Sequence, residues 1–202
     1  MKYLFSVLLF FFFGLVLAQT KDQLIEQAQD YQLKLNAEYS NSETSILSRK
    51  DFKNFKGLEF YPIDAKYIVQ AKFIRTPDEK PFKMATTTDR LATEVKYGEA
   101  HFEIDGKKLK LELYQSVPPM TDPEYVDYLF LPFTDDTNGD GSYGGGRFID
   151  ARIPTGDIIV IDFNKAYNPY CAYNSKYSCP IPPRANRLAI RIEAGVKDFR
   201  QR

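Results

Sequence analysis

Two runs of alternating apolar and polar residues flank Asp105-Gly106 and leave this segment little freedom in how it folds. Asp-Gly favours a two-residue type I′ turn, which fixes the pairing of the strands on either side. Around such a turn Phe102 lies opposite Leu109 and Ala100 lies opposite Leu111, so that apolar residues share one face. The sequence therefore predicts a β-hairpin with one face in the core.

The opposite face of the predicted hairpin carries charged residues. Glu99 falls opposite Glu112, and a like-charge pair at this position argues mildly against the register. His101, the only histidine in the chain, lies on the same face. We interpret it as a solvent-facing residue rather than a catalytic one.

Further strands are predicted where β-branched and aromatic residues are common, at 66–76, 82–87, 128–133, 158–163 and 188–193. The run Ile158-Ile159-Val160-Ile161 is apolar at every position, which is typical of a strand covered on both sides near the centre of a fold. Many short strands with one long helix predict a mainly β fold, either an antiparallel sandwich or a barrel-like meander.

The segment before the predicted strands is helical in character. Thr20-Lys21-Asp22-Gln23 has the form of a capping box. Large or apolar residues then recur at three- and four-residue spacing along one face, at Leu24, Ala28, Tyr31, Leu35 and Tyr39. We expect an amphipathic helix over 22–39, and a second short helix from Ser48 that carries Phe52 and Phe55 toward the core.

The amino terminus has the pattern of an export signal. Lys2 precedes an apolar run from Leu4 to Leu17, and the small residue Ala18 closes it. The run is shorter than the roughly 20 residues of a membrane-spanning helix, so a permanent anchor is not expected. Residues 1–18 are thus predicted to be a cleaved signal peptide, followed by a helical segment at 19–57 and one β-rich domain at 58–202.

Charge gives no indication of a nucleic-acid partner. The 27 basic and 27 acidic residues balance and are mixed along the chain, so there is no electrostatic footprint for nucleic acid or an anionic membrane. After signal cleavage we expect no membrane span and an extracytoplasmic location, periplasmic or secreted.

The two cysteines, Cys171 and Cys179, both follow the predicted cleavage point. A pair of cysteines in an oxidising compartment is predicted to form a disulfide. Two thiols far in sequence from the single histidine lack the ligands of a tetrahedral zinc site. No metal and no cofactor is predicted.

Rare residues recur in a fixed order in the last third of the chain. The blocks are Phe133-Thr-Asp-Asp-Thr137, Tyr143-Gly-Gly-Gly-Arg147-Phe148, Asp162-Phe-Asn-Lys-Ala-Tyr-Asn-Pro-Tyr-Cys-Ala172 and Cys179-Pro-Ile-Pro-Pro-Arg-Ala-Asn186. They resemble the signature of a bacterial and archaeal family called domain of unknown function 1684, over roughly 58–197. The resemblance implies a fold and a site, but no reaction.

Ionic, amide and phenolic side chains concentrate in these blocks around glycines. The predicted ligand-binding residues are Asp135, Thr137, Tyr143, Arg147, Asp162, Asn164, Tyr167, Asn168 and Asn186. Arg147 would either contact an anionic or polyhydroxy ligand or brace the loops by pairing with Asp135 or Asp162. The asparagines would either face the ligand or satisfy backbone groups in turns.

A neighbouring run has the alternation of a calcium loop. Asp136, Asn138 and Asp140 supply oxygen atoms at alternate positions, but Arg147 stands where a helix-loop-helix site needs a bidentate glutamate. A glycine-containing turn is the favoured interpretation.

The leading functional hypothesis is a soluble extracytoplasmic binding or accessory domain for a small polar or anionic ligand. One alternative is a hydrolase that uses Asp135 and Asp162 as paired carboxylates. Another is a purely structural envelope protein, in which the polar cluster is buried. The sequence leaves open whether the protein is an enzyme.

Overall fold

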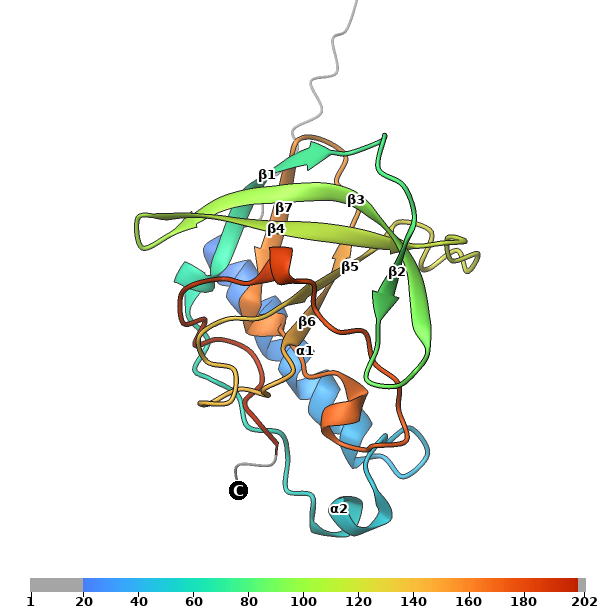
Figure 1. Ribbon diagram of the computed structural model, residues 1–202. Coiled ribbons are helices and arrows are strands. Elements are labelled where there is room, and N and C mark those ends of the chain that lie inside the picture. The colour runs from blue at the N-terminus through green and yellow to red at the C-terminus, as the bar shows by residue number, and fades with distance from the viewer. Residues whose placement is uncertain (1–19, 200–202) are drawn as a thin grey trace, which may run out of the picture.

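One antiparallel sheet of seven strands forms the centre of the computed structural model, which describes residues 20–199 (Figure 1). The strands are β1 (Ile68–Arg75), β2 (Phe82–Ala85), β3 (Leu91–Ile104), β4 (Lys107–Ser116), β5 (Tyr128–Phe133), β6 (Arg147–Arg152) and β7 (Ile158–Asp162). Their order is β6-β5-β4-β3-β1-β7, with β2 beside β3. The sheet curls into a half-barrel in which the two edge strands β6 and β7 approach each other. The predicted mainly β, antiparallel fold is confirmed.

The hairpin β3–β4 has the predicted register, with Phe102 opposite Leu109 and Ala100 opposite Leu111. Asp105 and Gly106 form its turn, both with the positive φ that a type I′ loop needs. Its apolar face is in the main core, where Ala100 and Leu111 are fully buried.

The unfavourable pair Glu99–Glu112 is also present in the hairpin, and two lysines compensate it. Lys110 Nζ lies 2.9 Å from Glu99 Oε1. Lys96 Nζ lies 3.5 Å from Glu99 and 3.7 Å from Glu112. His101 is half-exposed and its Nε2 lies 3.0 Å from Glu99 Oε2, on the outer face as expected.

Two strand predictions were wrong. The run in β7 is not covered on both sides, because β7 is an edge strand and exposes 48% of Ile158 and 44% of Val160. The segment 188–193 forms no strand and contains bends at Ala189 and Ile190. Its backbone bonds instead with a loop and a side chain: Leu188 N donates to Thr134 O, and Ile192 O accepts from Arg147.

The helical segment forms as the sequence predicts. Helix α1 (Lys21–Ser40) starts at the capping box of Thr20 and Gln23, and α2 (Arg49–Asn54) starts at Ser48. Four single 3₁₀ turns complete the structure: η1 (Ala65–Tyr67), η2 (Phe163–Lys165), η3 (Tyr170–Ala172) and η4 (Arg184–Asn186). Nowhere in residues 20–199 is there a helix with the length and apolar content to cross a bilayer.

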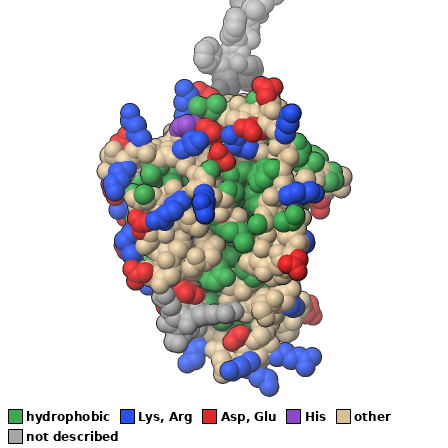
Figure 2. Space-filling view, in the orientation of Figure 1, with side chains coloured by type: hydrophobic (Ala, Val, Ile, Leu, Met, Phe, Trp, Pro, Cys, Tyr) green, Lys and Arg blue, Asp and Glu red, His purple; other side chains and the backbone are tan. Residues whose placement is uncertain are grey.

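Apolar side chains form three clusters. The largest fills the concave side of the half-barrel, and a second joins the carboxyl end of α1 to the loops, with Tyr39 edge-on to Tyr173 at 4.9 Å between ring centroids. The third is smaller and includes Phe130 and Phe148. Apolar side chains also gather at the centre of the face seen in Figure 2, and charged ones lie around it.

Candidate functional site

Arg147 lies completely buried and braces three segments of the chain. Its Nη2 donates to Asp135 Oδ2 at 2.8 Å, to Thr137 Oγ1 at 3.3 Å and to the Ile192 carbonyl at 2.8 Å. Its Nη1 donates to the Ala194 carbonyl. The side chains of Arg147 and Asp135 are both 0% exposed. Of the two roles considered for Arg147, the structure shows bracing.

This ion pair also bears on the hydrolase hypothesis. Paired-carboxylate catalysis needs both acids on an open cleft. Asp135 is instead sealed against Arg147, and its second oxygen accepts from the backbone of Thr137 and Ile192. Asp135 is therefore not placed to act as a general acid or base.

Asn186 acts as a substitute for missing strand pairing. β4 and β5 share a single paired position, Tyr114 with Phe130. Beside this gap, Asn186 Oδ1 accepts from Glu112 N at 2.8 Å, and its Nδ2 donates to the carbonyls of Glu112 at 2.8 Å and Pro132 at 2.6 Å. The amide thus holds two diverging strands together.

Asn164 and Asn168 have similar backbone-satisfying roles. Asn164 bonds both the N–H and the carbonyl of Asp64, at 3.0 and 3.1 Å, and Asp162 Oδ1 accepts from its Nδ2 at 2.9 Å. Asn168 Nδ2 donates to the Lys197 carbonyl at 3.0 Å. Burial raises the pKa of Asp162 from its ordinary value.

The run with calcium-like alternation forms a braced turn. Asp136 pairs with Arg187 at 2.8 Å, and Asp140 pairs with Arg191 at 2.9 Å. Asn138 Nδ2 donates to the carbonyl of Tyr143, another predicted site residue, which is half-buried. Among the described residues no group of three or more His, Cys, Asp or Glu side chains is arranged to hold a metal ion.

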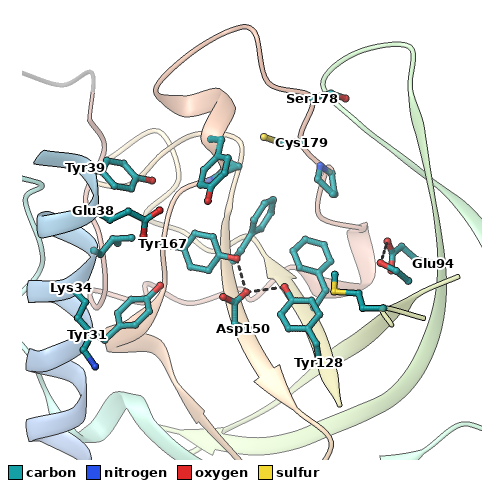
Figure 3. Close-up of a pocket in the computed structure, with 18 residues that line it drawn as sticks. Tyr31, Lys34, Glu38, Tyr39, Glu94, Tyr128, Asp150, Tyr167, Ser178 and Cys179 are labelled. Atoms are coloured by element: carbon teal, nitrogen blue, oxygen red, sulfur yellow. Dashed lines mark hydrogen bonds between the residues drawn. The ribbon is translucent and has the colours of Figure 1, made fainter. Parts of the chain in front are cut away.

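A cavity of about 610 Å³ lies elsewhere, between helix α1 and the sheet (Figure 3). Of the nine predicted site residues, only Tyr167 lines it. The structure therefore does not gather those nine side chains into one pocket. Most of them are buried and form hydrogen bonds with backbone groups of the loops. Those backbone groups have no partner in a strand or helix, so a side chain has to supply one.

The side chains that line the cavity follow from simple periodicity. Successive side chains of a strand alternate between its faces, so Tyr128 and Phe130 of β5, and Phe148 and Asp150 of β6, face the cavity while their neighbours enter the main core. Helix α1 contributes one face at three- and four-residue spacing, with Tyr31, Lys34, Leu35, Glu38 and Tyr39.

Asp150 is held at the centre of the cavity by two phenols. The hydroxyls of Tyr128 and Tyr167 donate to its Oδ1 at 2.8 and 2.6 Å. Figure 3 shows the two rings approaching this carboxylate from opposite sides. Burial raises the pKa of both phenols well above the usual value, so they stay protonated as donors. Within residues 20–199 the Oδ2 atom accepts no hydrogen bond, so one acceptor remains free for a ligand.

Glu94 is a second carboxylate of the cavity and lies on β3. It is only 6% exposed, and its Oε1 accepts from Ser116 Oγ at 3.0 Å. Its Oε2 is buried and has no partner in the described structure. Burial raises the pKa of Glu94 above its ordinary value, while Ser116 and Arg90 act in the opposite direction.

The predicted disulfide is absent. Cys171 and Cys179 are free thiols, and Cys179 Sγ accepts from the backbone N–H of Cys171 at 3.1 Å. A hydrogen bond from Cys179 lowers the pKa of Cys171 to about 6. This polar contact brings the two cysteines together in the loop. The spacing of two cysteines in a sequence does not distinguish such a contact from a disulfide.

Comparison with known proteins places this architecture in a family. The family model described as "Protein of unknown function (DUF1684)" matches residues 53–197. The chain belongs to this family. None of the curated proteins compared with it matches.

A solved structure is similar over almost the whole described chain. It is the solution NMR structure of the uncharacterized protein from gene locus rrnAC0354 of Haloarcula marismortui, with 28% sequence identity and a TM-score of 0.70. The alignment covers 90% of this chain and 97% of that one. The matched DUF1684 segment contains the strands that carry Asp150 and Glu94, but helix α1 lies before it.

Sequence reasoning named Tyr167 but missed Asp150 and Glu94, the carboxylates that the strands bring to the cavity. Asp150 had a usable signal, because it follows Phe148 by two positions and so shares its face in a strand. Glu94 had none, since nothing near it in sequence shows that Ser116 and the cavity lie beside it. The blocks that resemble the DUF1684 signature drew the prediction to side chains that support the loops.

Proposed function

We propose that this DUF1684 protein is an exported binding domain that holds a small molecule in the cavity between α1 and the strands β5 and β6. The ligand would have an apolar body and a hydrogen-bond donor. The observation that carries the proposal is the free Oδ2 of Asp150, whose other oxygen is fixed by Tyr128 and Tyr167. A preoriented acceptor costs little to use in binding, because its rotamer is already fixed.

The size and lining of the cavity support a small molecule. Its volume of about 610 Å³ is within the usual range for ligand pockets, which are apolar with a few placed polar groups. Phe130 and Phe148 form an aromatic floor, with ring centroids 4.8 Å apart. The anionic ligand expected from Arg147 has no counterpart here, since this site presents carboxylates.

Export is the second part of the proposal. It depends on the signal-like residues 1–18, which lie outside the described residues. Cleavage after Ala18 would place the cavity in the periplasm or outside the cell. The intact mass of the exported protein is the direct test: a chain that starts at Gln19 supports export, and an uncleaved chain opposes it.

Binding can be tested with phenethyl alcohol, a probe with one apolar ring and one hydroxyl donor. Added to the ¹⁵N-labelled protein, it should shift amide signals of α1, β5 and β6, with affinity on the order of millimolar for so small a molecule. Asp150→Ala should weaken binding several-fold. The control is Asp140→Ala, an aspartate with an 85% exposed side chain outside the cavity, which should leave binding unchanged. Shifts outside the cavity, or none at all, would contradict the proposal.

A further inference from the structure

Glu94 carries an inference that rests on the proposed binding function and makes it more specific. Its Oε2 is buried at the cavity wall and accepts no hydrogen bond from the described residues. A buried acceptor without a partner is costly, and a buried carboxylate more so. Because Glu94 is one of the residues that line the cavity, this unpartnered oxygen belongs to the cavity wall.

Arg90 does not supply Glu94 with a partner. Arg90 influences the Glu94 carboxylate electrostatically, but its guanidinium is bonded to Ser178. Arg90 Nε donates to Ser178 Oγ at 3.1 Å, and Nη2 donates to the Ser178 carbonyl at 2.9 Å. Within the described structure Glu94 therefore forms no ion pair.

The cavity as a whole has an acidic and aromatic lining. Asp150, Glu94 and Glu38 contribute three carboxylates, against the single ammonium of Lys34. Five phenol rings border the same space: Tyr31, Tyr39, Tyr128, Tyr167 and Tyr170. Figure 3 shows Asp150 between Tyr128 and Tyr167, with Tyr31 and Glu38 toward helix α1 and Glu94 on the opposite side. Aromatic faces together with carboxylates are the groups that attract an organic cation.

We propose that the ligand of this cavity is an organic cation, an amine or ammonium on an apolar body, and that Glu94 gives the cavity its preference for positive charge. The cationic group donates to or lies against Glu94 Oε2, the aromatic floor covers the apolar body, and Asp150 Oδ2 accepts a second donor. Glu94 is then a specificity-determining residue, while Asp150 serves any ligand with a donor.

Three probes of one shape separate charge from shape: phenethylammonium, phenethyl alcohol and phenylacetate, which are a cation, a neutral molecule and an anion at pH 7. NMR titration of the unmodified protein should show the cation binding about tenfold more tightly than the alcohol. Phenylacetate should bind more weakly than either. Equal binding of cation and alcohol, or tighter binding of the anion, would overturn the cation preference.

Glu94→Gln then tests the assigned residue, because it keeps the shape and the acceptor but removes the charge. We expect the cation preference to fall below about twofold, because the affinity for the cation falls more than the affinity for the alcohol. Glu38→Gln is the matched control, because Glu38 is an exposed residue of α1 whose charge is screened by solvent, and it should keep most of the preference. If Glu94→Gln kept the full preference for the cation, Glu94 would not be the residue that sets this preference.

The two proposals fail in different ways. If none of the three probes shifts signals of the cavity, the binding function itself is wrong. If all three bind in the cavity with equal affinity and Asp150→Ala weakens each, the binding function stands and the cation preference falls. The comparison among probes uses the unmodified protein, so it decides the matter even where a variant does not fold.

Discussion

At the residue scale, Arg147 shows how one buried charge can serve the fold. Its guanidinium joins the Asp135 loop to the carbonyls of Ile192 and Ala194, in a segment that no strand pairs. Such a pair stabilises little relative to apolar residues of the same volume, but removing one partner leaves an uncompensated buried charge.

We therefore expect Arg147→Ala to lower the free energy of unfolding by about 3–5 kcal/mol, measured by urea denaturation. Arg187→Ala breaks the exposed pair with Asp136 and should cost at most about 1 kcal/mol. If Arg147→Ala were as stable as the parent but no longer bound the cavity probes, the result would contradict bracing and support a role of Arg147 in ligand binding.

At the element scale, the irregularity in β3 makes one position sensitive. The register of β3 on β4 shifts between Lys96 and Gly98. A Cβ on Gly98 would lie 2.5 Å from the Phe73 ring and 2.8 Å from the Ile74 carbonyl, both on β1. The backbone of β3 approaches β1 closely there, so only glycine fits without a shift.

Gly98→Ala should therefore destabilise the protein by about 1–3 kcal/mol through overpacking. The matched control is Gly156→Ala, since a Cβ at Gly156 meets nothing within 4 Å, and we expect it to stay within about 0.5 kcal/mol of the parent. Thermal melting of both variants checks this. Equal melting temperatures would contradict the prediction, because they would mean that the Phe73 ring and the β1 backbone can shift without loss of stability.

The elements that were predictable are those specified locally. Asp105-Gly106 sets the hairpin register by its turn geometry, and Thr20 with Gln23 sets the start of α1. β7 was misjudged because an edge strand and a central one can have the same composition, and only the strand order separates them. β6 was missed because Arg147 is polar yet buried, which hides the alternation.

At the scale of the whole molecule, burial of acids makes folding stability depend on pH. The pKa of Glu94 and that of Asp162 are both raised in the folded protein, mainly by burial. The folded state thus holds these protons more tightly than the unfolded state does. Their contribution to stability is full below the ordinary carboxyl pKa and is lost as pH rises through the raised values.

Glu94→Gln should reveal this dependence, because glutamine does not titrate. We expect the melting temperature of Glu94→Gln to exceed that of the parent at pH 7 by more than it does at pH 4, in scans of the two proteins over that range. A difference that stays constant with pH would mean that Glu94 keeps an ordinary pKa in the fold.

The candidate site could not be predicted because it is assembled from distant parts of the chain. Tyr31, Glu94, Asp150 and Tyr167 come together only after the sheet has curled and α1 has covered it. The residues that the sequence singled out, such as Asn186, instead bond backbone groups and support the loops.

The helix that forms one wall of the cavity lies outside the segment that defines the family. The matched residues begin at 53, whereas α1 spans Lys21–Ser40. The family match therefore covers the strands at the floor of the cavity and not the helix on its other side. If the proposed binding function holds, relatives that share the half-barrel but differ in the helix can take different ligands, so a ligand found for one of them has to be tested again in the next.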